Sequence, residues 1–177
     1  MAKTTKTGPL DKKTDSKSVA KTPFKFSKQH KFVIGSLLVL FSIALLFAFI
    51  SFFIYGKQDQ SAVQELTNRS EIVENWLGKF GAYLADLLIY RGFGLAAFIF
   101  VRLFFLSGIY MVLDISVQKL KNIWFWDLFV IIILSVLFGF FATSAPELGG
   151  TIGYELNLFF QDYLGKTGTL LILIFGL

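Results

Sequence analysis

Two long stretches of this chain contain no charged residue, and they restrict the possible folds more than any other feature. Ile34–Gly56 and Leu128–Pro146 carry no Asp, Glu, Lys or Arg. An apolar stretch of about 18 or more residues is long enough to cross the hydrocarbon core of a bilayer as a helix. Backbone polar groups in lipid must be bonded internally, and a helix achieves this within one segment. The sequence therefore predicts an all-α integral membrane protein.

The composition agrees with this prediction and excludes several kinds of site. Of the 177 residues, 55% are hydrophobic, 22 are Phe and only 16% are charged. The chain has no Cys and a single His, His30, which lies in a lysine-rich segment. Disulfide frameworks and thiolate metal sites are therefore excluded, and a metal or catalytic site based on histidine is not expected.

The N-terminal segment is basic. Met1–Lys31 holds nine lysines against Asp11 and Asp15. Such a segment cannot bury enough apolar surface to offset its chain entropy, so we expect residues 1–31 to form a disordered tail. Cationic residues beside a span favour the cytoplasmic side of the membrane. The same lysines attract anionic lipid headgroups, and non-specific contact with DNA is an alternative use of their charge.

Hydropathy divides residues 32–177 into a transmembrane domain with short loops. The expected spans are 32–55, 93–113, 123–143 and an incomplete fourth at 167–177, and an amphipathic entry helix at 76–90 precedes the second span. The eleven residues Thr167–Leu177 rise only about 16 Å along a helix, roughly half a bilayer. We therefore expect the chain to be the front of a longer protein.

The charges of the connectors predict the topology. Gly56–Glu74 holds two basic residues against four acidic ones, and Ser144–Gly165 holds acidic residues and no basic one. Asp114–Asn122 holds Lys119 and Lys121 against Asp114 and is net positive. The positive connector and the tail are expected in the cytoplasm and the other two connectors outside. Within the last connector, Glu155–Tyr163 is expected to form a short amphipathic helix on the membrane surface.

Small residues precede and enter the second span. Read at 100° per residue, they fall on one face of a single helix: Gly78, Gly81, Ala82, Ala85, Gly92 and Ala96. Small side chains let helix backbones approach closely in lipid, so this face is predicted to be a helix-packing surface. Gly92 and Gly94 also indicate a kink at the join between the entry helix and the span.

Arg102 and Asp127 are charged residues inside predicted spans. A central arginine costs at least about 2.5 kcal/mol and usually faces protein or water. In an antiparallel hairpin of the second and third spans, Arg102 and Asp127 would come together. The favoured interpretation is a structural pair within or between subunits. Snorkelling of Arg102 to the headgroups and an ion or proton pathway are the alternatives.

No residue in the chain is predicted to be catalytic, to bind a cofactor or to hold a metal. Gly165-Lys166-Thr167 superficially matches the end of a phosphate-binding loop. That motif requires a glycine five residues before Gly165, and Phe160 stands there.

Three short segments carry a resemblance to a known family. Asn75–Asp86 reads Asn-Trp-Leu-Gly-x-x-Gly-Ala-x-x-Ala-Asp, Gly94–Ala97 reads Gly-Leu-Ala-Ala, and Leu164–Leu170 opens the fourth span. Together with the basic tail, the first span and the short outer connector, they resemble the four-helix N-terminal membrane domain of FtsK/SpoIIIE-type DNA translocases, in a Bacteroidetes-like version. The resemblance covers roughly Phe32–Leu177.

The resemblance implies a non-catalytic domain that anchors a DNA translocase in the bacterial inner (cytoplasmic) membrane at the division septum. It implies assembly into a hexamer, contacts with other cell-division proteins, and a role in chromosome segregation. An ATPase motor that uses ATP and Mg²⁺ and binds DNA would follow Leu177. The alternative is a subunit of a multi-helix transporter or channel, which predicts paired intramembrane charges, broken helices and internal repeats.

Overall fold

The computed structural model describes residues 27–64 and 73–177, and every regular element in these ranges is helical. The elements are α1 (Lys28–Gln64), α2 (Gly78–Ala85), the π-helix η1 (Asp86–Phe93), the 3₁₀-helix η2 (Gly94–Ala97), α3 (Phe98–Val112), α4 (Val117–Phe138), the 3₁₀-helix η3 (Gly139–Phe141) and α5 (Pro146–Gly176). Predictions for residues 1–26 of the tail and for residues 65–72 of the outer connector lie outside the described residues.

In the described part of the chain, four helical segments are long and apolar enough to cross a membrane: Lys28–Gly56, Gly78–Val112, Gln118–Phe141 and Pro146–Gly176. The predicted fold class, all-α with four transmembrane segments, is confirmed. The first helix begins four residues before the predicted Phe32 and continues past Tyr55 to Gln64.

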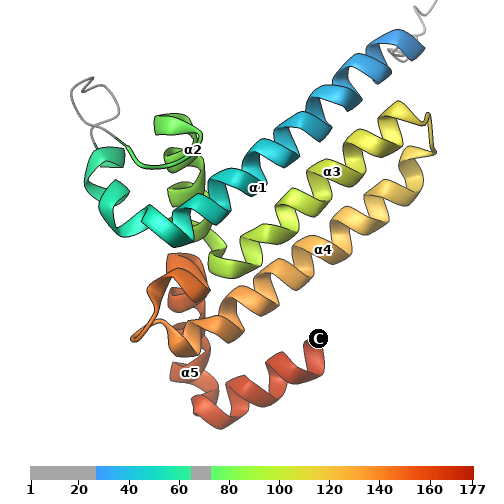
Figure 1. Cartoon of the computed structure of the whole chain (residues 1–177). Helices are drawn as coiled ribbons and strands as arrows, with labels where there is room; N and C mark the ends of the chain where they lie inside the picture. Colours follow the sequence, from blue (N-terminus) through green and yellow to red (C-terminus); the bar gives the residue numbers. More distant parts are fainter. Residues whose placement is uncertain (1–26, 65–72) are drawn as a thin grey trace, which may run out of the picture.

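Helices α1, α3 and α4 lie side by side as one layer (Figure 1). Helix α3 packs against both of its neighbours, whereas α1 and α4 do not contact each other within the described residues. Lys31 Nζ of α1 lies 2.6 Å from Asp114 Oδ1, just beyond α3, so α1 begins where α3 ends. We call this the lysine end of the layer, because Lys28, Lys31, Lys119 and Lys121 belong to it.

Two glycines set the contact between α1 and α3. A Cβ atom on Gly35 would stand 2.7 Å from the carbonyl oxygen of Gly108, and a Cβ on Gly108 would stand 2.6 Å from that of Gly35. Such distances are too short for any side chain. The two backbones therefore touch directly, which is how small residues allow helices to pack in lipid.

Glycines also build the opposite end of the layer. Gly94 and Gly150 have positive φ angles of 62° and 67°, and Gly92 has non-helical angles. A Cβ on Gly94 would collide with the Leu148 carbonyl, and a Cβ on Gly150 would collide with the Gly92 carbonyl. The break before α3 and the break within α5 thus fit against each other. We call this the glycine end.

Helix α5 changes direction twice, because Gly150 and Gly165 have non-helical angles within it. Figure 1 shows its middle part running past the glycine end of the layer and its last part turning back alongside α4. Leu173 of that last part packs with Ile133 and Val136 of α4. Glu155–Tyr163, predicted as a short helix, is helical, but it forms part of a longer helical segment that begins at Pro146. Gly149 and Gly150 follow Pro146 closely, and glycines of this kind indicate a loop, so the sequence did not indicate a helix there.

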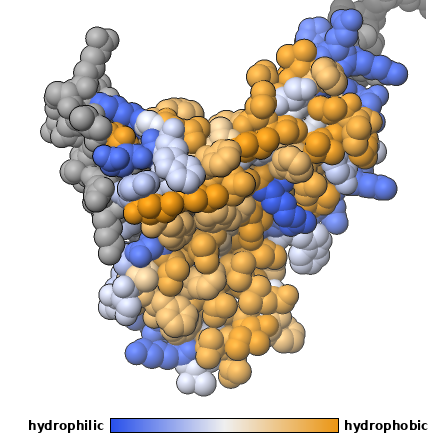
Figure 2. All heavy atoms as spheres, in the orientation of Figure 1, coloured by the Kyte–Doolittle hydropathy of each residue, from blue (hydrophilic) through white to orange (hydrophobic). Residues whose placement is uncertain are grey.

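The surface of the layer is mostly apolar. Figure 2 shows hydrophobic residues over most of this face, with hydrophilic residues toward the lysine end, along the opposite margin and in one small patch within the apolar face. Exposed side chains such as Leu40, Phe105, Phe125 and Leu171 are 63, 41, 66 and 63% accessible. In water such a surface would cause aggregation, whereas in a bilayer it faces acyl chains.

Candidate assembly surface and intramembrane ion pair

The six small residues of the predicted packing face do not share one helix face. The chain changes from α-helix to π-helix at Asp86 and to 3₁₀-helix at Gly94, so a constant 100° rotation does not apply. Gly81, Ala82, Ala85, Gly92 and Ala96 are buried within the chain, and Gly78 is only partly buried. Gly78 has φ of +63° and a Cβ there would meet no atom within 4 Å. The prediction of a continuous ridge is therefore wrong, and Gly78 is a turn residue at the start of α2.

The first half of the set packs α2 against α1. A Cβ on Gly81 would lie 3.4 Å from Ala48 Cβ, and Ala85 packs in one cluster with Leu45 and Phe49. Asn75 fixes the entry to α2, because its Nδ2 donates to the Ala48 carbonyl at 3.1 Å and its Oδ1 accepts from the Leu77 N–H at 3.1 Å. This part of the set therefore makes an internal contact.

The second half of the set, Gly92 and Ala96, makes contacts with α3, α4 and α5. Ala96 packs with Leu103 of α3 and Ile131 of α4 in a cluster of their own. The backbone of Gly92 meets Gly150 at the glycine end. The small residues therefore allow close contacts within the chain at two separate places.

Arg102 of α3 and Asp127 of α4 are brought together. Nη1 of Arg102 donates to both carboxylate oxygens of Asp127, each at 2.7 Å. The side chain of Asp127 is 11% accessible, whereas that of Arg102 is 59% accessible. Arg102 stands twelve residues before Asp114 in the sequence, about 18 Å along a helix axis from the lysine end. An arginine at that depth lies well inside a hydrocarbon core of about 30 Å.

The exposed edge of Arg102 borders a shallow apolar groove between α1 and α3. The groove has a volume of about 380 Å³ and is lined by Ser42, Ile43, Leu46, Phe98, Val101, Arg102 and Phe105. Within the described residues, Nη1 is the nitrogen of Arg102 that bonds to protein, and Asp127 is its acceptor. The hydrogen bonds within the described residues do not use the remaining guanidinium donors of Arg102.

A second ion pair was not predicted from the sequence. Arg91 Nε donates to Asp86 Oδ2 at 2.7 Å, and the Asp86 side chain is 6% accessible. The five-residue separation suits the π-helix η1, in which residues five apart lie one turn apart. Asn75 and Asp86 are the first and last residues of the segment that carries the family resemblance, and both side chains are buried and hydrogen-bonded.

Hydrogen bonds of polar side chains join α4 to α3 and to α5. Trp124 Nε1 donates to Ser107 Oγ at 2.9 Å near one end, and Asn157 Nδ2 donates to the Val136 carbonyl at 2.9 Å near the other. Ser135 Oγ donates to the Gly149 carbonyl at 2.8 Å. Sequence reasoning did not single out these contacts, although a polar residue inside an apolar run is the signal that could have indicated them.

Within residues 27–64 and 73–177, no group of three or more His, Asp or Glu side chains is arranged to hold a metal ion. The described features are four membrane-crossing segments, glycine-mediated contacts, and charged side chains that pair with one another. They define a multi-pass integral membrane domain.

Comparison with known proteins gives the family. The sequence model of one protein family, the 4TM region of DNA translocase FtsK/SpoIIIE, matches residues 28–177. The chain therefore belongs to this family. The resemblance noted in the sequence is confirmed. No curated protein and no solved structure matches the chain significantly.

Proposed function

We propose that this chain is the membrane-anchoring and self-association domain of a septal DNA translocase that acts in chromosome segregation and cell division. The observation that carries the proposal is the family match over residues 28–177 together with four membrane-crossing segments in the same range. The domain itself performs no reaction. It holds a translocase at one place in the inner membrane.

The lysine end lies in the cytoplasm in this proposal. Lys28, Lys31, Lys119 and Lys121 gather there, and positively charged connectors are retained on the cytoplasmic side. The last part of α5 turns back alongside α4 and so heads toward the lysine end. A motor attached after Leu177 would then reach cytoplasmic DNA, ATP and Mg²⁺.

Self-association is supported by the open layer. Within the described residues α1 and α4 are not packed against each other, and the layer presents the exposed side chain of Arg102 beside an apolar groove between α1 and α3. A charged side chain that faces lipid is costly and is usually covered by protein. A second copy would cover Arg102 at the same depth, because rotation about the membrane normal keeps every residue at its depth. A hexamer is the assembly that the family resemblance implies.

The self-association test uses the absence of native cysteines. Two differently tagged copies, one with Phe105→Cys and one with Ile43→Cys, are co-expressed in bacterial membranes and treated with a short bifunctional maleimide. Both positions line the groove and are accessible. Cross-linked heterodimers between the two tags are expected. A matched pair at the exposed positions Leu37 and Leu171, which do not line the groove, is expected to react much less. Equal cross-linking of both pairs would indicate random collision and contradict the groove as the contact.

The anchoring role is tested separately. A fluorescent fusion of the chain in a dividing bacterium is expected at the division septum. Reporter fusions within Asp114–Asn122 are expected to report a cytoplasmic location, and those within Glu147–Asp162 an external one. A uniform membrane signal would contradict the proposed septal location. The opposite topology in the reporter fusions would contradict the proposed anchoring role, because it would place the motor outside the cytoplasm.

A further inference from the structure

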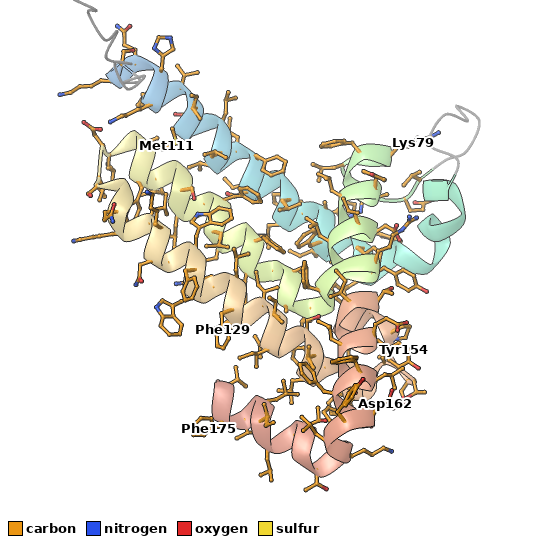
Figure 3. The ribbon with its side chains drawn as sticks, turned by 180° about the vertical axis from the view of Figure 1, so that it is seen from behind. Lys79, Met111, Phe129, Tyr154, Asp162 and Phe175 are labelled. Carbon is orange, nitrogen blue, oxygen red and sulfur yellow. The ribbon has the colours of Figure 1, made fainter. Side chains whose placement is uncertain are left out.

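A crevice opens at the lysine end between the start of α1 and the end of α3. Its volume is about 470 Å³. Figure 3 shows Met111 at the end of α3, beside the start of α1. Two kinds of side chain line the crevice. Its polar lining residues are Lys28, Gln29, Lys31 and Asp114, and its apolar lining residues are Phe32, Val33, Met111 and Val112. We call it the Lys28 crevice.

The crevice stands at the boundary between charged and apolar sequence. Lys31 is followed by no charged residue until Lys57, so the membrane-embedded part of α1 starts immediately below the crevice. The backbone contact of Gly35 with Gly108 lies about one turn further along α1. The crevice therefore lies at the level where lipid headgroups meet acyl chains, next to the tight crossing of α1 and α3.

The charges in the crevice do not cancel. Asp114 accepts a hydrogen bond from Lys31 Nζ at 2.6 Å, and this bond together with the Lys31 charge lowers the pKa of Asp114. Two lysines against one carboxylate leave a net charge of +1. Lys28 is exposed and makes no ion pair with the described residues. Lys31 keeps two of its three N–H donors.

We propose that the Lys28 crevice binds the headgroup phosphate of an anionic phospholipid. Lys28 and the free donors of Lys31 bond to the phosphate oxygens. Phe32, Val33, Met111 and Val112 contact the first carbons of the acyl chains. The net positive charge of the crevice favours an anionic lipid over a zwitterionic one. A zwitterionic headgroup carries a cation of its own, and Asp114, the carboxylate that lines the crevice, is already paired with Lys31. Such a lipid would wedge α1 against α3 at the headgroup level.

The test compares two lysine substitutions with the same change in charge. The chain is reconstituted in nanodiscs of equal parts phosphatidylglycerol and phosphatidylcholine, released, and examined by native mass spectrometry for retained lipid. Lys28→Gln is expected to lower retained phosphatidylglycerol about fivefold, the factor that one lysine near an anionic surface provides. Lys121→Gln is the matched control, because Lys121 is exposed at the same end and does not line the crevice. Equal losses in both variants, or no loss in Lys28→Gln, would overturn the proposal.

Two further measurements complete the test. Val33→Ser, at a side chain that is 56% accessible, removes an apolar contact without touching a charge or the core. It is expected to lower retention of the lipid while leaving circular dichroism unchanged, and unchanged retention would contradict the acyl-chain contacts. Inorganic phosphate at millimolar concentration is expected not to displace the lipid. Full displacement would show that the crevice recognises free phosphate and would overturn its assignment to a lipid. None of these outcomes depends on the translocase function.

Discussion

Arg102 holds Asp127 through a single nitrogen, Nη1, which lies 2.7 Å from both carboxylate oxygens. The bond joins α3 to α4 at bilayer depth, so removal of one partner leaves an uncompensated charge. Arg102→Ala and Asp127→Ala are each expected to lower the free energy of unfolding. The double variant is expected to lose less than the sum, with a coupling of about 0.5–3 kcal/mol. Unfolding in mixed detergent micelles measures all four corners of the cycle.

The control for this cycle combines Arg102→Ala with Asp86→Ala. Asp86 pairs with Arg91 and not with Arg102, so the two losses should add. Additive losses in the Arg102 and Asp127 cycle as well would mean that the contact contributes nothing. An ion pathway through Arg102 makes a different prediction, namely ion flux in liposomes that Arg102→Ala abolishes.

The contact between Gly35 and Gly108 leads to a second prediction. Gly108→Ala places a Cβ 2.6 Å from the Gly35 carbonyl oxygen, and backbone can give way there only if α1 and α3 separate. The expected cost is about 1–3 kcal/mol, the usual range for overpacking. Thermal unfolding in detergent, followed by tryptophan fluorescence, measures it. Gly168→Ala is the control, because a Cβ there meets only Leu164 Cβ at 3.2 Å. Equal stability of both variants would contradict a tight crossing.

Much of the architecture could be predicted because hydropathy is a local property. Charge-free runs located the membrane-crossing segments, and the opposite charges of Arg102 and Asp127 pointed to the contact between α3 and α4. Gly92 and Gly94 indicated the break before α3. Each of these inferences needs only the sequence near the residue concerned and the alternation of direction that consecutive spans impose.

The packing of small residues could not be predicted in the same way. The ridge from Gly78 to Ala96 assumed a uniform α-helix, whereas η1 and η2 have different numbers of residues per turn. Gly150 fits beside Gly92 only because α5 folds back onto the break before α3, and that relation is not local. The contact between Gly35 and Gly108 could have been predicted, since a glycine within an apolar run has no obvious role other than to let two helices approach closely.

The pH dependence of stability follows from Lys31 and Asp114. The Lys31 hydrogen bond and charge hold the pKa of Asp114 below its ordinary value, and Lys28 adds to this. A depressed pKa in the folded state stabilises the fold above the unfolded pKa of about 3.9. That contribution is lost as pH falls through the lower folded value. The wild type is therefore expected to have a larger free energy of unfolding than Asp114→Asn at pH 6. This difference is expected to shrink toward pH 3. A constant difference would mean that the carboxylate charge is irrelevant.

Gly150 and Gly165 allow backbone strain to be separated from crowding. Their backbone angles are nearly identical, with φ and ψ of 67° and 173° at Gly150 and 68° and 168° at Gly165. This region is almost restricted to glycine and costs other residues about 1–3 kcal/mol. Alanine at either position should carry that cost. A Cβ on Gly165 meets no atom within 4 Å, whereas a Cβ on Gly150 would also lie 2.6 Å from the Gly94 nitrogen and 2.6 Å from the Ile89 carbonyl oxygen.

Gly150→Ala is therefore expected to destabilise the chain more than Gly165→Ala, by a further amount of about 1–3 kcal/mol from overpacking. The excess belongs to the contact of α5 with the break before α3, because the strain term is common to both variants. Parallel unfolding curves in the same detergent give the difference directly. If the two variants are equally stable, the glycines at 92, 94 and 150 serve only to turn the chain and do not hold the two breaks together.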